Sequence, residues 1–227
     1  MDNIKIPKRI STALLNSITS GVTPRLGIEH IAVGRKREIE TLLADLDNIA
    51  QGGSVFRFIV GRYGSGKSFL LQIIRNYAIE RGYIVTDADL SPERKLIGGN
   101  NSGLATYREL LRNMSSKVRP DGGALSALLD RWIDNIRLKL IAENVAEEEL
   151  PKKLEQRILL DIASTEEFVH GYDFSKVLQA YWRGFYLGND DLKNAAMKWL
   201  RGEYSTKADA YSELGVRSII TDDSWFD

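Results

Sequence analysis

The sequence predicts an α/β fold, with a core built around a parallel sheet at residues 1–120 and a mainly helical portion at residues 121–227. Val55–Val60 is dominated by β-branched and aromatic residues, which is typical of a strand, and Tyr83–Leu90 has a similar pattern. A glycine-rich turn and an apolar helical stretch lie between them. This order of elements is typical of two parallel strands joined by a right-handed crossover.

Helices in the core are expected from the spacing of apolar residues and from the glycines that follow them. They lie at Ile10–Thr19, at about Arg35–Gln51, and from about Gly66 to Arg81. A short extended piece, His30–Gly34, leads into the second of these helices, and Gly82 ends the third.

The rest of the chain has mostly helical periodicity. The expected helices are Leu104–Ser116, Ala124–Glu143, Glu147–Ala163, Thr165–Leu187, Asp190–Arg201 and Ser205–Leu214. The fourth of these is expected to break near Gly171, and Val216–Thr221 is expected to be extended. The aromatic residues of this portion are expected to pack between helices, with a docking surface for a partner as the alternative.

The composition is that of an ordinary globular protein, and it excludes several kinds of site. Hydrophobic residues make up 43% and charged residues 27%, and the 31 Lys and Arg balance the 31 Asp and Glu. This balance gives no indication of a nucleic-acid partner and leaves a local basic patch open. Because cysteine is absent and histidine occurs only at His30 and His170, neither a disulfide nor a zinc site is expected. Without a long apolar run or a secretory signal, the expected location is cytoplasmic, away from membranes.

The segment Gly61–Ser68 reads GRYGSGKS and matches the phosphate-binding pattern GxxxxGK[ST] in full. Its glycines let backbone N–H groups wrap around phosphate oxygens, and the following helix adds its positive N-terminal end. Lys67 is the candidate catalytic residue, because its charge lies against the β- and γ-phosphates, and Ser68 is the candidate Mg²⁺ ligand. The residues expected to bind the nucleotide here are Gly61, Arg62, Tyr63, Gly64, Ser65, Gly66, Lys67, Ser68 and Phe69. The expected ligands are ATP and Mg²⁺, GTP stays open, and the alternative is a glycine-rich turn without a ligand.

A second short motif, Val33–Glu38, precedes the loop by one expected helix. A GR-x-x-E turn in this position resembles the AAA+ ATPases of the origin-recognition type and the related STAND signalling ATPases. The resemblance implies that Ala32–Arg35 line the pocket for the base, so Gly34 and Arg35 join the candidate nucleotide-binding residues. The alternative is an ordinary helix start in which Glu38 is solvated.

A wider set of segments resembles the ATP-binding domain family associated with BREX phage-exclusion systems, from about Pro7 onward. The segments that carry this resemblance are Phe58–Leu71, Val85–Ser91, Tyr107–Leu110, Trp199–Glu203 and Leu214–Arg217. It implies an ATPase that works with other proteins of a bacterial defence system, and it leaves oligomerisation open.

Hydrolysis of ATP also needs a Walker B acid, which holds Mg²⁺ at the end of a strand. Three segments are candidates: Ile84–Asp87 with the nearby Asp89, Ile158–Asp161 in a helical context, and Ile219–Asp223 with its paired acids Asp222 and Asp223. None is convincing. In the family, the Walker B strand follows the part represented here by Leu214–Ile220, so a truncated AAA+-like module is expected.

The sequence therefore predicts the ATP-binding module of an AAA+/STAND-like ATPase from a BREX-type defence system, with little turnover by this chain alone. Three alternatives stay open. The first is a nucleotide-sensing switch that binds ATP without turnover, and the second is a small phosphate-loop phosphotransferase. The third is a scaffold in which the nucleotide is only structural.

Overall fold

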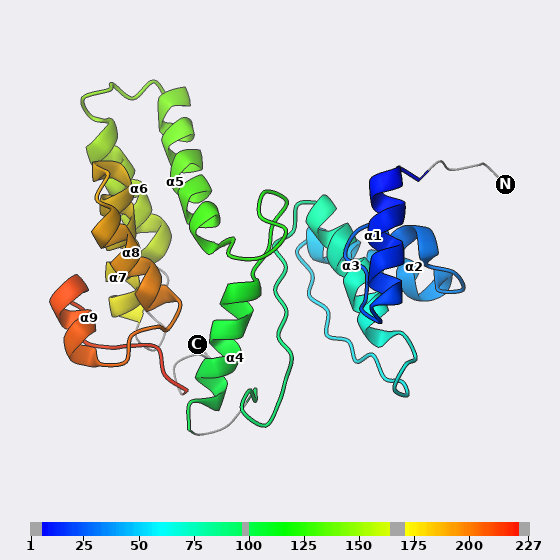
Figure 1. Cartoon of the computed structure of the whole chain (residues 1–227). Helices are drawn as coiled ribbons and strands as arrows, with labels where there is room; N and C mark the ends of the chain where they lie inside the picture. Colours follow the sequence, from blue (N-terminus) through cyan, green and yellow to red (C-terminus); the bar gives the residue numbers. More distant parts are fainter. Residues whose placement is uncertain (1–5, 97–99, 164–170, 223–227) are drawn as a thin grey trace. The chain divides into compact units, whose positions relative to one another are not determined.

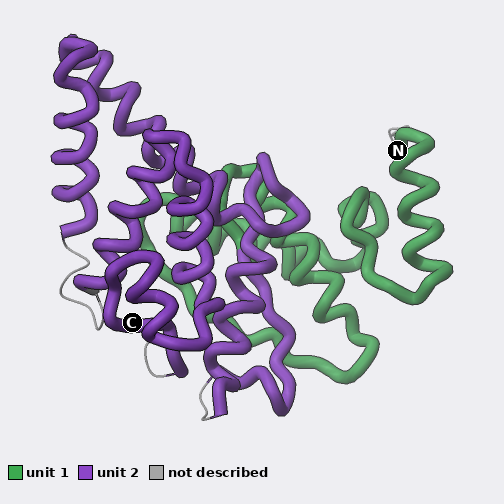
Figure 2. Tube along the Cα trace, turned by 60° about the vertical axis from the view of Figure 1, so that its left-hand side comes forward, with its two compact units in different colours: residues 1–85 green, residues 86–227 purple. Residues whose placement is uncertain are grey.

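The structure is a computed structural model that describes residues 6–96, 100–163 and 171–222. Contacts within the chain divide it into two compact units, Met1–Val85 and Thr86–Asp227, which are coloured separately in Figure 2. The predicted functional division into a nucleotide-binding core at 1–120 and a helical portion at 121–227 stays a prediction.

The predicted α/β fold is wrong, because the described residues are helical or irregular and contain no β-strand. Neither Val55–Val60 nor Tyr83–Leu90 forms a strand. The side chains of Phe56, Phe58 and Val60, which a sheet would cover on one face, are 80–92% exposed. The preference of such residues for strands depends on packing against neighbouring strands, and these segments have no such neighbour in the described chain.

The described residues of unit 1 form three α-helices, labelled in Figure 1, and one turn of 3₁₀ helix. These are α1 (Lys8–Thr19), η1 (Ile28–Ile31), α2 (Lys36–Ala50) and α3 (Lys67–Glu80). The packing of α3 against α2 and η1 buries a small apolar core that includes Ile28, Leu70 and Ile73. Because α3 contributes most of this core, the loop that precedes α3 is anchored at its end by a firmly packed helix.

The described residues of unit 2 form six helices, and the last five of these surround a larger core. The helices are α4 (Ser102–Asn113), α5 (Leu125–Ala142), α6 (Leu150–Ala163), α7 (Gly171–Leu187), α8 (Asp190–Leu200) and α9 (Lys207–Leu214). The closest pair, α7 and α8, lies side by side in Figure 1. Gly184 allows this approach, since a Cβ atom at this position would lie 2.7 Å from the backbone nitrogen of Lys193.

The predicted packing role of the aromatic residues is confirmed for most of them. Tyr181, Trp182 and Trp199 are buried, and Trp132, Phe174 and Phe185 pack against the same core. Tyr186 is half exposed and stacks on Trp182, with ring centroids 5.9 Å apart. The helix positions predicted from periodicity are likewise confirmed to within a few residues, except for residues 165–170, which lie outside the described chain.

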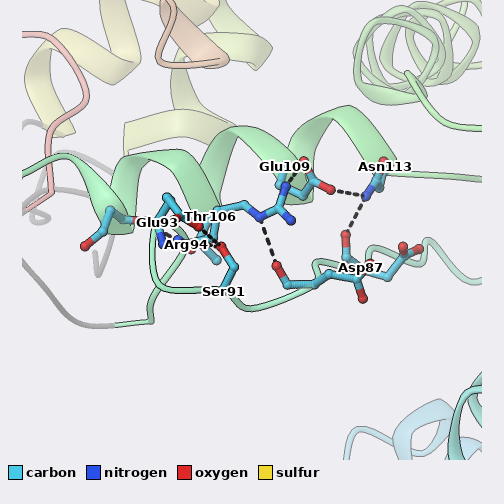
Figure 3. A network of polar contacts seen from close by, with 9 residues as sticks. Asp87, Ser91, Glu93, Arg94, Thr106, Glu109 and Asn113 are labelled. Atoms are coloured by element: carbon cyan, nitrogen blue, oxygen red, sulfur yellow. Dashed lines mark hydrogen bonds and ion pairs between the residues drawn. The ribbon is translucent and has the colours of Figure 1, made fainter.

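Side chains of α4 hold the irregular segment that the sequence presents as a second strand (Figure 3). Asn113 donates from Nδ2 to the backbone carbonyl of Asp87 at 2.9 Å, and Arg94 forms an ion pair with Glu109 at 3.4 Å. Thr106 donates to the carbonyl of Lys95 at 2.8 Å. The bond from Asn113 satisfies a backbone carbonyl that a sheet would otherwise bind, so the predicted strand lies along a helix instead of along another strand.

None of the helices in the described parts of the chain combines the length and apolar character that crossing a membrane requires.

Candidate functional site

The predicted phosphate loop is the stretch that leads directly into α3. Two of its glycines have positive φ angles, 75° at Gly64 and 83° at Gly66, a region in which other residues are strained. Gly61 also lies tightly in the loop, since a Cβ atom at this position would lie 2.5 Å from Oγ of Ser65. The backbone conformation at these positions therefore explains the glycine spacing of the motif.

Lys67, the first residue of α3, reaches back over the loop. Its Nζ donates to the backbone carbonyls of Gly61 and Arg62, at 3.0 Å each. A third bond, from the backbone nitrogen of Ser65 to the carbonyl of Arg62 at 3.1 Å, closes a turn beneath the ammonium. The structure thus places one ammonium group over the turn of the loop.

The N-terminus of α3 favours an anion. Gly66 at the N-cap provides no side-chain hydrogen bond, and the first turn contains no acidic residue. The first amides of an α-helix have no acceptor within the helix, and they carry a partial positive charge of about half a unit. Ser68 is exposed in this same first turn, so its hydroxyl is open to a ligand. Amides and an ammonium donate hydrogen bonds to phosphate, and a hydroxyl oxygen can ligate Mg²⁺, so this short segment offers groups suited to both.

Arg35, the N-cap of α2, contacts this loop although thirty positions separate it from Ser65. Its Nη2 donates to the carbonyl of Ser65, and its Nη1 forms an ion pair with Glu38 at 3.0 Å. A hydrogen bond from its own backbone amide and that from Arg35 hold the pKa of Glu38 below its usual value. The GR turn and the phosphate loop, separate in sequence, therefore meet in space.

The other candidate binding residues surround this centre. Arg62 and Tyr63 are exposed, and Phe69 is half-buried at the start of α3. Gly34 has a positive φ of 76° and faces open space, so it shapes the turn that presents Arg35. Whether these residues contact a nucleotide stays a prediction.

Two of the acids considered for Walker B have other partners. Asp161 lies on α6 and pairs with Arg157 at 3.6 Å, as the helical context predicts. The carboxylate of Asp222 accepts from the backbone nitrogens of Asn101 at 2.6 Å and Leu104 at 2.8 Å, so it caps the start of α4.

Two further candidates are not strand-end acids either. Asp87 and Asp89 belong to the irregular segment beside α4, and Arg94 donates to the carbonyl of Asp89 at 2.9 Å. Asp223 lies outside the described residues.

Sequence reasoning missed the structural use of Asp173, a buried carboxylate on α7. Its Oδ2 accepts from the backbone nitrogen of Ser218 at 2.8 Å, from the hydroxyl of Ser218 at 2.6 Å and from the nitrogen of Arg217 at 3.1 Å. Nothing in the local pattern marks a residue whose partners lie 44 and 45 positions away.

We expect Arg35→Ala to lower nucleotide affinity about threefold to tenfold, because the lost bond to Ser65 leaves the loop less ordered before binding. Arg37→Ala, an exposed cation on the same helix, is the matched control and should bind like the parent. Fluorescent-nucleotide titration of both variants checks this. Equal affinity for Arg35→Ala and the parent would contradict a bracing role for Arg35.

Residues 6–227 of the chain match a protein family described as "BREX system ATP-binding protein BrxC/D". This match covers nearly the whole chain and confirms the family resemblance inferred from its motifs. Neither a curated protein nor a solved structure matches the chain.

Proposed function

The chain belongs to the family of BREX system ATP-binding proteins BrxC/D, and we propose that it binds MgATP through the loop Gly61–Ser68. One observation carries this proposal. The uncapped N-terminus of α3, the ammonium of Lys67 and the guanidinium of Arg35 all meet at a single glycine-shaped loop. Such a convergence of donors is the requirement for holding a polyphosphate.

Lys67 binds the β- and γ-phosphates by exchanging its carbonyl partners for phosphate oxygens. Its two present bonds, to Gly61 and Arg62, are to neutral carbonyls at 3.0 Å. A bond between an ammonium and a phosphate oxygen is charge-assisted and roughly twice as strong as a bond between neutral groups. The exchange therefore favours the phosphate, and the loop amides and the positive end of α3 add to it.

The metal belongs beside Ser68. Mg²⁺ prefers oxygen ligands and is commonly held by one or two protein oxygens together with phosphate oxygens. The exposed hydroxyl of Ser68, one residue after Lys67, fits that requirement. Mg²⁺ would neutralise charge on the bound phosphates, while the backbone of the loop sets their position.

Gly34 and Arg35 shape the edge of the site where the base and ribose lie. The bond between Arg35 and Ser65 supports this assignment, because it brings the GR turn to the phosphate loop. The assignment of the protein to the AAA+/STAND-like ATPases rests on the same turn.

This chain alone binds ATP with little turnover. The helical position of Asp161 and the capping role of Asp222 support this, because both of these carboxylates already have structural partners. A nucleotide-sensing switch is the second candidate function. The contact of Arg35 with Ser65 favours it, because a ligand that moves the loop would change this contact and so the position of the start of α2.

The Mg²⁺ dependence of ATP binding tests the site. We expect the parent chain to bind ATP more tightly with Mg²⁺ than with a chelator, and Ser68→Ala to lose most of that difference, because the hydroxyl ligand is gone. Calorimetric titration with and without Mg²⁺ measures it, with the exposed Ser54→Ala as control. If Ser68→Ala keeps the full Mg²⁺ effect, the metal is held elsewhere.

A further inference from the structure

Unit 2 contains a basic cavity of about 390 Å³ that the proposed nucleotide site does not use. Its volume lies in the range of about 300–1,000 Å³ that small-molecule sites occupy. Three of the residues that line it are arginines and one is a glutamate. The lining consists of Arg108, Leu111, Arg112, Gly123, Arg201 and Glu203.

The cavity forms where the C-terminal ends of α4 and α8 meet. Arg108 and Arg112 lie one turn apart on α4 and so share a face, and Arg201 is the C-cap of α8. Two contacts fix the helices together. Tyr107 donates from its hydroxyl to the carbonyl of Leu200 at 2.6 Å, and Arg108 donates from Nε to the carbonyl of Gly202 at 2.8 Å.

The hydroxyl of Tyr107 is a stable donor at this junction. Burial raises its pKa to about 12, so it stays protonated at neutral pH. The bond from this hydroxyl to the carbonyl of Leu200 is therefore kept at neutral pH.

The charges of the cavity do not cancel. Three guanidinium groups face one carboxylate, that of Glu203, and two helix C-termini each contribute about half a negative charge. The balance leaves about one positive charge. Arg108 is bound to a carbonyl, but within the described chain the guanidinium groups of Arg112 and Arg201 have neither an ion pair nor a hydrogen bond.

An ordinary structural explanation accounts for only part of this arrangement. A cation near each helix C-terminus stabilises the helix dipole by about 0.3–1 kcal/mol, and one arginine for each helix would be enough. Arg108 has a structural use of another kind, its bond to the carbonyl of Gly202, so what is left without one is the open space between the three guanidinium groups. A guanidinium group is a planar fork that suits a phosphate in bidentate fashion.

We infer that this cavity binds a phosphate group, with Arg112 and Arg201 as its main donors. Arg108 holds the two helices in register and adds its charge. The cavity is wider than one phosphate needs, so it accommodates the group to which the phosphate is attached. A soluble polyphosphate and the backbone of a nucleic acid both offer this chemistry.

Binding of pyrophosphate to the full chain tests the inference. The measurement uses a Lys67→Ala background, so that the loop of unit 1 does not contribute. We expect saturable binding by calorimetry at low salt, weakened about fivefold to tenfold by Arg112→Gln or Arg201→Gln, since each removes a charge-assisted contact. Arg137→Gln is the control, because Arg137 is an exposed arginine on α5 outside the cavity.

A variant that is expected to tighten binding distinguishes a change in the site from damage to the fold. Glu203→Gln removes the only carboxylate among the described residues that line the cavity, and it should tighten pyrophosphate binding about twofold to fivefold. Damage to the fold would weaken binding instead. The inference is overturned if pyrophosphate does not bind, if Arg137→Gln weakens binding as much as Arg112→Gln, or if Glu203→Gln has no effect.

A labelled single-stranded oligonucleotide of about 12 nucleotides distinguishes the two sources of phosphate. If the backbone is the ligand, pyrophosphate competes with the oligonucleotide. Arg112→Gln then lowers the salt dependence of its affinity by about 0.7 in the log–log slope, as expected for one lost phosphate contact. If only pyrophosphate binds, the ligand is a soluble polyphosphate. Either result supports the phosphate site in unit 2. Neither result bears on the proposal that the loop in unit 1 binds MgATP.

Discussion

Replacing Lys67 with Ala is expected to lower the affinity for MgATP more than about 100-fold. The substitution removes an ammonium that makes two hydrogen bonds over the loop and that we assign to the β- and γ-phosphates. A hydrogen bond to a charged group contributes about 1.5–3 kcal/mol, and two such bonds account for an effect of this size. Titration with MgATP followed by calorimetry measures it.

The matched control is Lys36→Ala. Lys36 is an exposed lysine of the same unit whose one ion pair, with Glu40 at 3.8 Å, lies on the helix surface. This variant should bind MgATP like the parent, because surface pairs of this kind contribute little. An equal loss of affinity in both variants would indicate a general effect of charge and would remove Lys67 from its assigned role.

Replacing Asp173 with Ala is expected to destabilise the chain by about 3–5 kcal/mol. The buried carboxylate accepts three hydrogen bonds from Arg217 and Ser218, and without it three donors lose their partner inside the fold. These bonds hold the segment after α9 against α7, and Ser218 in turn accepts from the indole of Trp199 at 2.7 Å. The loss should therefore spread to the core of unit 2.

Urea unfolding followed by tryptophan fluorescence measures this change. Asp134→Ala, which removes an exposed carboxylate on α5, should change the free energy of unfolding by less than about 0.5 kcal/mol. A similarly small change for Asp173→Ala would show that the segment after α9 is held by its apolar contacts alone.

The helices could be predicted from the sequence because their apolar residues repeat at the helical period and their ends are marked locally. Gly82 follows α3, and Asn189 and Thr206 cap α8 and α9 with their side chains. The phosphate loop could be predicted for the same reason, since all its residues lie within one short stretch. Local signals of this kind need no knowledge of the rest of the fold.

The strands were predicted wrongly because a strand depends on its neighbours. Phe56 and Phe58 have the side chains of a strand, yet their rings meet each other edge to face with centroids 4.9 Å apart, and both stay exposed. The segment near Asp87 is bound by Asn113 of α4 instead of by another strand. Single-residue preferences contain no information on such distant partners.

The contacts that shape the candidate site show the same limit. The link between Arg35 and Ser65 spans thirty positions, and the cap that Asp222 provides for Leu104 spans 118. From the sequence alone, Asp222 has the pattern of a metal-binding acid. Only the structure shows that its carboxylate caps a helix.

The most direct test of the account is a titration of the full chain with MgATP, with phosphate release measured on the same sample. The account predicts saturable binding that is lost in Lys67→Ala, and little or no release of phosphate. Absence of saturable binding would contradict the central claim that the loop Gly61–Ser68 holds the nucleotide. Robust phosphate release would contradict the proposal that this chain alone lacks the acid for turnover.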